Sequence, residues 1–126
     1  MALAIRSHRD LRVYQAARDA AMEVFRLSVG FPTEERFALT DQVRRSSRAV
    51  CANLAEAWRR RRYPAAFKNK ITDAESEAEE TRVRLEFAQH CGYLAEETVA
   101  ALDGTYDVIL SQLVRMVQTA DKWAPD

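Results

Sequence analysis

The sequence predicts an all-α protein whose four amphipathic helices pack as an antiparallel up-down-up-down four-helix bundle. Glycine and proline number three each in 126 residues, and the segments between them are rich in the helix formers Ala, Glu, Arg and Leu. Apolar residues in these segments recur every three or four positions, which places them on one face of a helix. Short connections favour antiparallel neighbours. The length suits one domain, residues 1–126, with its core at about 9–122.

The first helix is expected to start near Arg9 or Asp10 and to end at about Ser28, because Gly30 and Pro32 follow it. Its spacing of three and four residues predicts a core side made of Leu11, Tyr14, Ala17, Ala21, Phe25 and Ser28.

The second helix is expected over residues 39–62, with Thr40 and Asp41 as its N-cap, after a short helix with an acidic first turn at 33–35. Its core face carries Val43, Val50, Leu54 and Ala57. A ridge of positive charge carries Arg44, Arg48, Arg59 and Arg62, which fall within about 60° of one another if the helix continues that far. A third face carries Ala49, Ala52 and Ala55, with Cys51 beside them. Small residues where a solvated helix would be charged predict a surface for a partner.

The third helix is expected to open at Pro64 and to stop at Gly92. Its apolar stripe is Phe67, Ile71, Ala74, Ala78, Thr81, Leu85 and Ala88. The fourth helix is expected from about Ala95 to Lys122, weakened in its early part by Gly104. Its inner stripe is Leu102, Tyr106, Ile109, Leu113 and Val117.

Charge is distributed unevenly although the formal net charge is zero. Residues 44–70 hold nine basic groups and one acidic group, and residues 71–126 hold four basic and twelve acidic groups. Such a division can hold helices or subunits together through complementary fields, or it can present the basic part to a polyanion.

Composition argues against several classes of protein. No apolar run approaches the roughly 20 residues needed to cross a bilayer, and the first ten residues lack the apolar core of a signal peptide, so a cytoplasmic protein without a membrane partner is expected. Cys51 and Cys91 show no metal-binding or redox spacing and are expected as free thiols.

Catalytic and cofactor sites have little support in the residue pattern. His8 and His90 are the only histidines, and no nucleophile triad or phosphate-binding glycine loop can be written. A ferritin-like di-iron enzyme, kept as a remote alternative, needs two Glu-x-x-His motifs, whereas Glu86 and His90 are four apart and have no counterpart. We therefore expect no enzyme activity, no metal, no cofactor and no small-molecule substrate.

Several segments resemble a known family. They are LRVYQAA near the start, GFPTEERFALTDQVRRSS, NLAEA, FKNKITDAESEAEET and HCGYL, in order between Arg9 and Thr119. These segments resemble the bacterial four-helix-bundle proteins named for 23S rRNA intervening sequences, among which are the accessory variability determinant proteins of diversity-generating retroelements. The resemblance implies a left-handed four-helix bundle that assembles into a homopentameric ring. For the retroelement branch it implies binding to nucleic acid and to a reverse transcriptase, and it implies no catalytic residue.

The NLAEA segment departs from the family pattern, which usually closes with glycine where this chain has Ala57, so a straighter helix is expected here. Asn53 lies at the margin of the apolar stripe and needs hydrogen-bond partners. Glu56 is expected to pair with Arg59 or Arg60 along the helix. With Ala49, Ala52 and Ala55, these two residues form the candidate subunit interface.

The basic residues lead to two hypotheses. In the first, a non-enzymatic homo-oligomeric scaffold binds RNA, DNA or a nucleoprotein such as a reverse transcriptase–RNA complex through phosphate contacts. The candidate residues are Arg44, Arg48, Arg59, Arg60, Arg61, Arg62, Lys68 and Lys70. In the alternative, the protein is a purely structural ring in which these residues pair with acidic surfaces of a neighbouring subunit.

Overall fold

The computed structural model describes residues 4–125 and contains no strand in that range. Its helices are α1 (Arg12–Ser28), α2 (Asp41–Arg59), α3 (Pro64–His90), α4 (Glu96–Gln118) and the short α5 (Ala120–Trp123). Short 3-10 turns precede α1 (His8–Asp10) and follow it (Thr33–Glu35), and a π-helical turn (Arg36–Thr40) leads into α2. The predicted all-helical class and the four long helices are confirmed.

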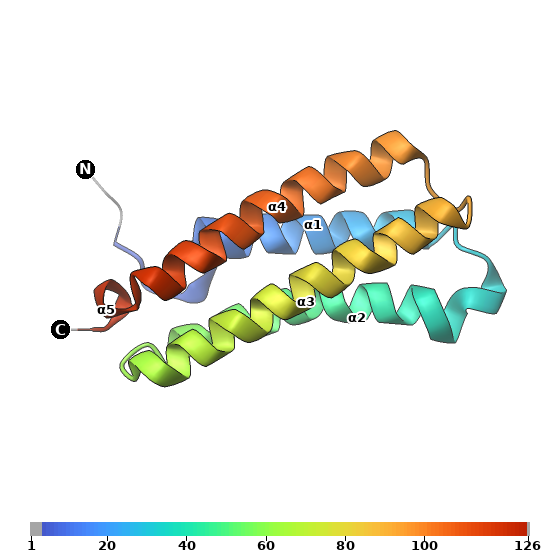
Figure 1. Cartoon of the computed structure of the whole chain (residues 1–126). Helices are drawn as coiled ribbons and strands as arrows, with labels where there is room; N and C mark the ends of the chain where they lie inside the picture. The colour runs from blue at the N-terminus through green and yellow to red at the C-terminus, as the bar shows by residue number, and fades with distance from the viewer. Residues whose placement is uncertain (1–3, 126) are drawn as a thin grey trace.

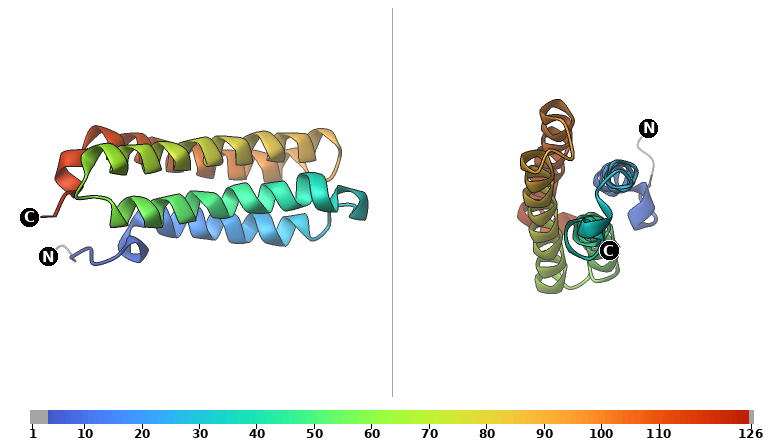
Figure 2. Two further views of the ribbon diagram at one scale, coloured as in Figure 1. Left: turned by 90° about the horizontal axis from the view of Figure 1, so that it is seen from below. Right: turned by 90° about the vertical axis from the view of Figure 1, so that its right-hand side faces the viewer.

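The four long helices lie side by side, and consecutive helices point in opposite directions (Figures 1 and 2). α2 packs most extensively against α3, followed by α3 against α4, α1 against α2 and α1 against α4. The start of α1, the α2–α3 turn and the end of α4 with α5 therefore lie at one end of the molecule (Figure 1). We call it the α5 end.

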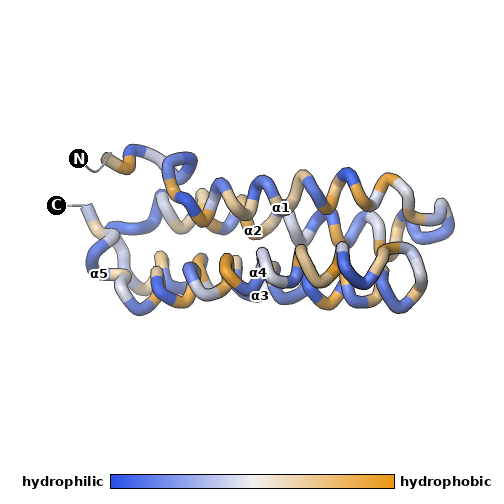
Figure 3. Tube along the Cα trace, turned by 90° about the horizontal axis from the view of Figure 1, so that it is seen from above, coloured by the Kyte–Doolittle hydropathy of each residue, from blue (hydrophilic) through white to orange (hydrophobic). Residues whose placement is uncertain are grey.

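The core follows the apolar stripes that the sequence predicts for α2 and α3. All four predicted residues of α2 and all seven of α3 are buried. In α4, four of the five predicted residues are buried and Val117 is partly buried. Figure 3 shows polar and apolar residues alternating along each helix instead of forming long apolar runs. Within the residues described, no helix is both long and apolar enough to span a bilayer.

The buried face of α1 agrees with the prediction in part. It is made of Val13, Ala17, Ala20, Ala21, Val24 and Ser28. Tyr14 is only partly buried and Phe25 is 36% exposed. Leu11, Ala17, Ala21 and Ser28 are buried as predicted, although Leu11 has extended backbone and precedes the helix. The prediction is wrong for Tyr14 and Phe25, which lie at the edge of the buried face.

The ends of α3 follow local rules. Pro64 occupies the first turn, as predicted. Gly92 has φ +80°, its N–H donates to the Gln89 carbonyl at 2.9 Å, and the N–H of Tyr93 donates to the Ala88 carbonyl at 2.8 Å. This left-handed glycine cap ends α3, as predicted.

The ends of α2 and α4 correct the predictions. Thr40 is not an N-cap, because the π-helical turn continues into α2 and leaves Thr40 in helical conformation without a capping hydrogen bond. At its other end α2 stops at Arg59 instead of residue 62. α4 stops at Gln118, because Thr119 leaves the helical conformation (φ −114°, ψ 30°) before α5 begins.

Candidate nucleic-acid interface

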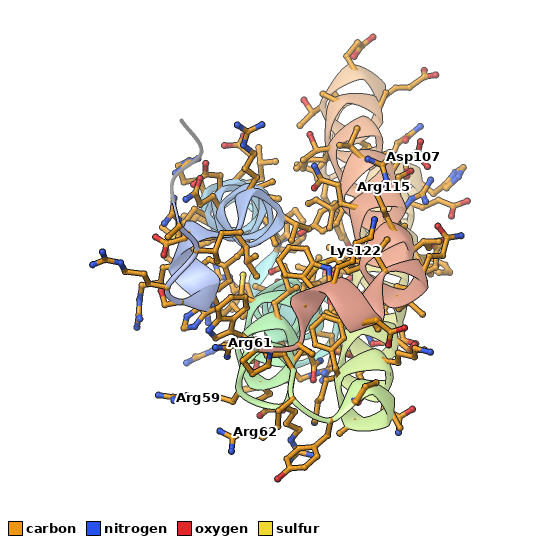
Figure 4. The ribbon with its side chains drawn as sticks, turned by 90° about the vertical axis from the view of Figure 1, so that its left-hand side faces the viewer. Arg59, Arg61, Arg62, Asp107, Arg115 and Lys122 are labelled. Atoms are coloured by element: carbon orange, nitrogen blue, oxygen red, sulfur yellow. The ribbon has the colours of Figure 1, made fainter. Side chains whose placement is uncertain are left out.

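Four consecutive arginines occupy the end of α2 and the turn that follows it. Arg59 is the last residue of α2, and Arg60, Arg61 and Arg62 lead toward Pro64. Arg59, Arg60 and Arg62 are exposed, whereas Arg61 is partly buried. Figure 4 shows Arg59, Arg61 and Arg62 at the α5 end of the molecule. Because the chain has left the helix, the guanidinium groups after Arg59 spread around this end instead of continuing one face of α2.

Aromatic rings hold two of these guanidinium groups. Arg61 donates from Nη1 to the Trp58 carbonyl at 2.8 Å, and its Cζ lies 4.0 Å from the centre of the Trp58 ring. Arg62 lies 5.9 Å from the Tyr63 ring. Trp58, which is 8% exposed, meets Trp123 of α5 edge to face, with ring centres 6.4 Å apart. Cation–π contacts of this kind hold the charge at the surface without neutralising it.

Arg44 and Arg48 lie in a different place and have different contacts. They precede Arg59 by 15 and 11 residues, which is about 22 and 16 Å along a helix. Arg44 donates from Nε to Ser28 Oγ at 2.7 Å. Its Cζ and that of Arg48 lie 4.8 and 5.7 Å from the Phe25 ring. The predicted ridge is wrong for Arg62, because α2 ends at Arg59. Arg44, Arg48 and Arg59 share one face of α2 as predicted, but their contacts differ.

The two lysines at the start of α3 also differ in their contacts. Lys70 pairs with Glu56 at 2.7 Å and approaches Asp73 at 3.9 Å, whereas Lys68 is exposed. The hydrogen bond from Lys70 lowers the pKa of the Glu56 carboxyl. The predicted ion pair of Glu56 with Arg59 or Arg60 is wrong, because the α2–α3 packing brings a lysine closer to the carboxylate.

Acidic side chains of α3 and α4 pair with arginines inside the chain. Arg45 of α2 pairs with Glu77 at 3.0 Å and with Glu80 at 3.4 Å. Arg82 of α3 likewise donates to both carboxylate oxygens of Asp103 on α4, at 2.8 and 3.1 Å. These pairs join neighbouring helices. The opposite charges of the two halves of the sequence therefore already meet within one molecule.

The antiparallel arrangement adds basic residues that the sequence did not single out. Arg12 starts α1, while Arg115 and Lys122 lie on α4 and α5, and all three are exposed. Arg115 lies three residues before the end of α4, and Lys122 lies on α5, so both belong to the α5 end. Figure 4, which looks onto this end, shows them on the side of α4, apart from Arg59 and Arg62 beside α2. No ion pair in residues 4–125 involves these three residues, Arg59 to Arg62, or Lys68. The sequence could have placed them here had the alternating helix directions been applied to the charges.

The small-residue face of α2 is partly covered by the chain itself. Ala52 and Glu56 are exposed, whereas Ala49, Asn53 and Ala55 are partly buried. Ala55 lines a hollow together with His8, Arg59 and Arg60. The turn at His8–Asp10 thus lies against this part of α2.

Two titratable groups beside this face have shifted pKa values. Desolvation, together with Arg9 and Arg59, lowers the pKa of His8. Cys51 is partly buried, and desolvation raises the pKa of its thiol to about 11.

The opposite end of the molecule is acidic. The connection after α1 carries Glu34 and Glu35, and the first turn of α4 carries Glu96 and Glu97. Tyr93 donates its hydroxyl to Glu35 at 2.9 Å and joins these two connections. Glu86 and His90 near the end of α3 are exposed. Within residues 4–125 no group of three or more His, Cys, Asp or Glu side chains is arranged to hold a metal ion.

The side-by-side helices and the arginine-rich α5 end define a small all-helical protein with a strongly charged terminal surface. The chain belongs to the 23S rRNA-intervening sequence protein family, whose model matches residues 9–115. It is also similar to the crystal structure of a protein with unknown function from the S23 ribosomal protein family from Bacteroides thetaiotaomicron. The two share 26% sequence identity with a TM-score of 0.76, over 85% of this chain and 99% of the other. No curated protein matches the chain.

Proposed function

We propose that this protein is a non-enzymatic scaffold that binds RNA or DNA through the phosphate groups of the nucleic acid. The observation that carries the proposal is the absence of ion pairs, among residues 4–125, for the basic side chains gathered at the α5 end. They are Arg12, Arg59, Arg60, Arg61, Arg62, Lys68, Arg115 and Lys122. We call this set the basic end.

The basic end is suited to a polyanion. Exposed guanidinium groups without a carboxylate partner lose no internal contact when they bind phosphate. Each phosphate that is neutralised also releases condensed counterions, so affinity falls as salt rises. Arg45 and Lys70 pair with carboxylates and Arg44 donates to Ser28, so we leave these three outside the proposed contact surface. Arg48 contacts only the Phe25 ring, and we leave it out because it lies about 16 Å from Arg59 along α2.

The family name supports a relation to ribosomal RNA insertions but states no activity. The resemblance to retroelement accessory proteins further suggests a nucleoprotein client, namely a reverse transcriptase–RNA complex. In this proposal the four helices form an up-down-up-down bundle, and several copies assemble into a ring, with five subunits by resemblance. A ring would present several basic ends to one nucleic acid and so raise the overall affinity.

The direct experiment replaces Arg59, Arg60 and Arg62 together with glutamine and leaves Arg61, which is stacked on Trp58, in place. The control replaces Arg18, Arg26 and Arg36, which are exposed arginines elsewhere, so that net charge changes equally. Binding to a labelled RNA hairpin is measured by fluorescence anisotropy over a salt series. We expect the first variant to reduce the dependence of log affinity on log salt by about 2 to 3, as expected for three lost phosphate contacts.

Equal losses in the two variants would show that only total charge matters and would refute the basic end as the binding surface. Failure of the wild-type protein to bind at low salt would refute nucleic-acid binding altogether.

A purely structural ring is the second candidate, and one observation favours it. A hollow of about 350 Å³ between α3 and α4 is lined by Glu79, Glu86, Glu96 and Asp103, with Arg82 as its basic residue. A neighbouring subunit could place its basic end against this acidic hollow. In that case the triple variant should dissociate in light scattering, and high salt should dissociate the wild-type assembly.

A further inference from the structure

A mostly apolar groove lies beside the basic end, between the start of α1 and the end of α4. Its volume is about 650 Å³. Its apolar lining includes Leu11, Met116 and Trp123. Among the four pairs of neighbouring long helices, α1 and α4 pack least extensively against each other, which leaves room for this groove. A hollow of this size with apolar lining and few polar groups has the character of a ligand site.

Gln112 is one of the residues that line the groove, and it carries an unsatisfied polar atom. Its side-chain oxygen is buried and has no hydrogen-bond partner in the part of the chain that the structure describes. Leaving such an acceptor unpaired destabilises the folded state by roughly 1–3 kcal/mol. The oxygen is shielded from solvent, so a donor in the groove reaches it only when the Gln112 side chain turns toward the groove. A hydrogen bond from an N–H or O–H of the occupant would then remove the penalty.

Arg12 and Arg115 supply positive charge to the same groove. Both line it, both are exposed, and neither forms an ion pair within residues 4–125. The acidic residue of the lining, Asp10, has other partners, because its carboxylate accepts hydrogen bonds from the backbone N–H groups of Arg6 and Ser7 at 2.8 and 3.2 Å. The groove is therefore suited to an anion whose remaining part is flat or apolar.

Two tryptophan side chains in edge-to-face contact connect the groove with the arginine turn. Trp123 lines the groove and contacts Trp58. The Cζ atom of Arg61 in turn lies 4.0 Å from the centre of the Trp58 ring. A nucleic-acid strand whose phosphates contact the arginine turn thus passes close to the groove.

We infer that the groove receives one unpaired nucleotide of the bound strand. Its base packs against Trp123 and Met116, an amino or imino N–H of the base donates to Gln112 Oε1, and the adjoining phosphate contacts Arg12 and Arg115. The inference rests on the proposed function and narrows it: the client exposes unpaired nucleotides, because a base in a duplex would have to leave its stack to enter.

An amphipathic carboxylate, such as a fatty acid, fits the observations less well. Its carboxylate would satisfy the guanidinium groups, but its alkyl chain has no donor for the buried oxygen of Gln112. A nucleobase brings both an aromatic face and N–H donors.

The test compares a single-stranded RNA with a blunt duplex of the same sequence, using wild-type protein, Trp123→Leu and Gln112→Leu. Phe37→Leu is the matched control, because Phe37 is 78% exposed and lies on the turn before α2, away from the groove. We expect Trp123→Leu to weaken single-strand binding about tenfold, within the range for one stacked base. Duplex binding should change by less than about twofold, and Phe37→Leu should change neither.

Gln112→Leu separates binding from folding. It removes both the unsatisfied oxygen and the hydrogen bond to the base, so single-strand affinity should fall severalfold while the melting temperature of the free protein rises. This variant decides the question if Trp123→Leu, which loses its contact with Trp58, fails to fold.

Three outcomes would overturn the inference. If wild-type protein binds the duplex as tightly as the single strand and neither groove variant alters that ratio, the inference fails while the proposed function stands. If decanoate binds in the groove and the four nucleoside monophosphates do not, the groove takes an amphipathic carboxylate instead. If no RNA binds at low salt, the inference and the proposed function fail together.

Discussion

The two ends of α2 carry the same residue type in different circumstances. Near its start, Arg44 is hydrogen-bonded to Ser28 and stacked on Phe25, and Arg45 pairs with Glu77. At its end, Arg59 and Arg60 are exposed and form no ion pair within the described residues. Arginines of the first kind hold helices together, and those of the second kind are available to a partner. The number of arginines in a segment therefore says less about function than the carboxylates and rings that the fold brings to them.

The largest effect that would test this comparison is on nucleic-acid binding. The variant with Arg59, Arg60 and Arg62 replaced by glutamine should lose roughly 100-fold in affinity at low salt, because three phosphate contacts are removed. Replacing Arg44 and Arg48 with glutamine should alter affinity by less than about threefold. Electrophoretic mobility shift or anisotropy measures both, and a larger loss in the second variant would reverse the assignment of the two ends.

The free energy of unfolding should depend more on Arg44 than on Arg59, the reverse of the expectation for binding. Arg44→Ala removes a hydrogen bond to a largely buried hydroxyl and a cation–π contact, so the free energy of unfolding should fall by about 1–2 kcal/mol. Arg59→Ala should alter it by less than about 0.5 kcal/mol, as for other exposed residues without partners. Urea denaturation gives both values, and similar losses at the two positions would mean that Arg59 has contacts within the fold or across a subunit interface.

The smallest effect concerns His8, which lies beside the basic end. Its pKa is lowered by desolvation and by Arg9 and Arg59. A bound phosphate favours the protonated imidazole, so the pKa of His8 should rise when RNA binds, and binding should tighten slightly as pH falls through that pKa. In Arg59→Gln the pKa of His8 should already be higher in the free protein. NMR titration of the His8 ring measures these shifts, and a pKa that falls on adding RNA would place the phosphates elsewhere.

Periodicity along the chain determines much of the fold. The stripe of α3 from Phe67 to Ala88 is buried at every predicted position, because a regular helix with its own start and stop residues fixes which side chains share a face. Pro64 and Gly92 act within a few residues of themselves, so their effects could be predicted locally. In α1 the buried face is wider than the predicted stripe, because it also includes Val13, Ala20 and Val24, and Tyr14 and Phe25 lie at its edge.

Charge partners could not be predicted in this way. Glu56 has Arg59 and Arg60 within four residues, yet it pairs with Lys70, which is 14 residues away on α3. Four arginines in succession indicate a basic segment, whereas Arg12, Arg115 and Lys122 are far apart along the chain and come to the same end only through the alternating directions of the helices. Ion pairs depend on distances in space, whereas apolar stripes depend on spacing along one helix.

By itself, the sequence determined the helical class, the buried stripes of α2 and α3, the boundaries at Pro64 and Gly92 and the family resemblance, because these depend on residue type and local spacing. Tertiary structure decided that α2 ends at Arg59, which arginines are paired, and that a groove with an unsatisfied Gln112 oxygen opens beside Trp123. Each of these results depends on how four helices pack against one another. That packing selects among the many arrangements that the same apolar stripes would allow.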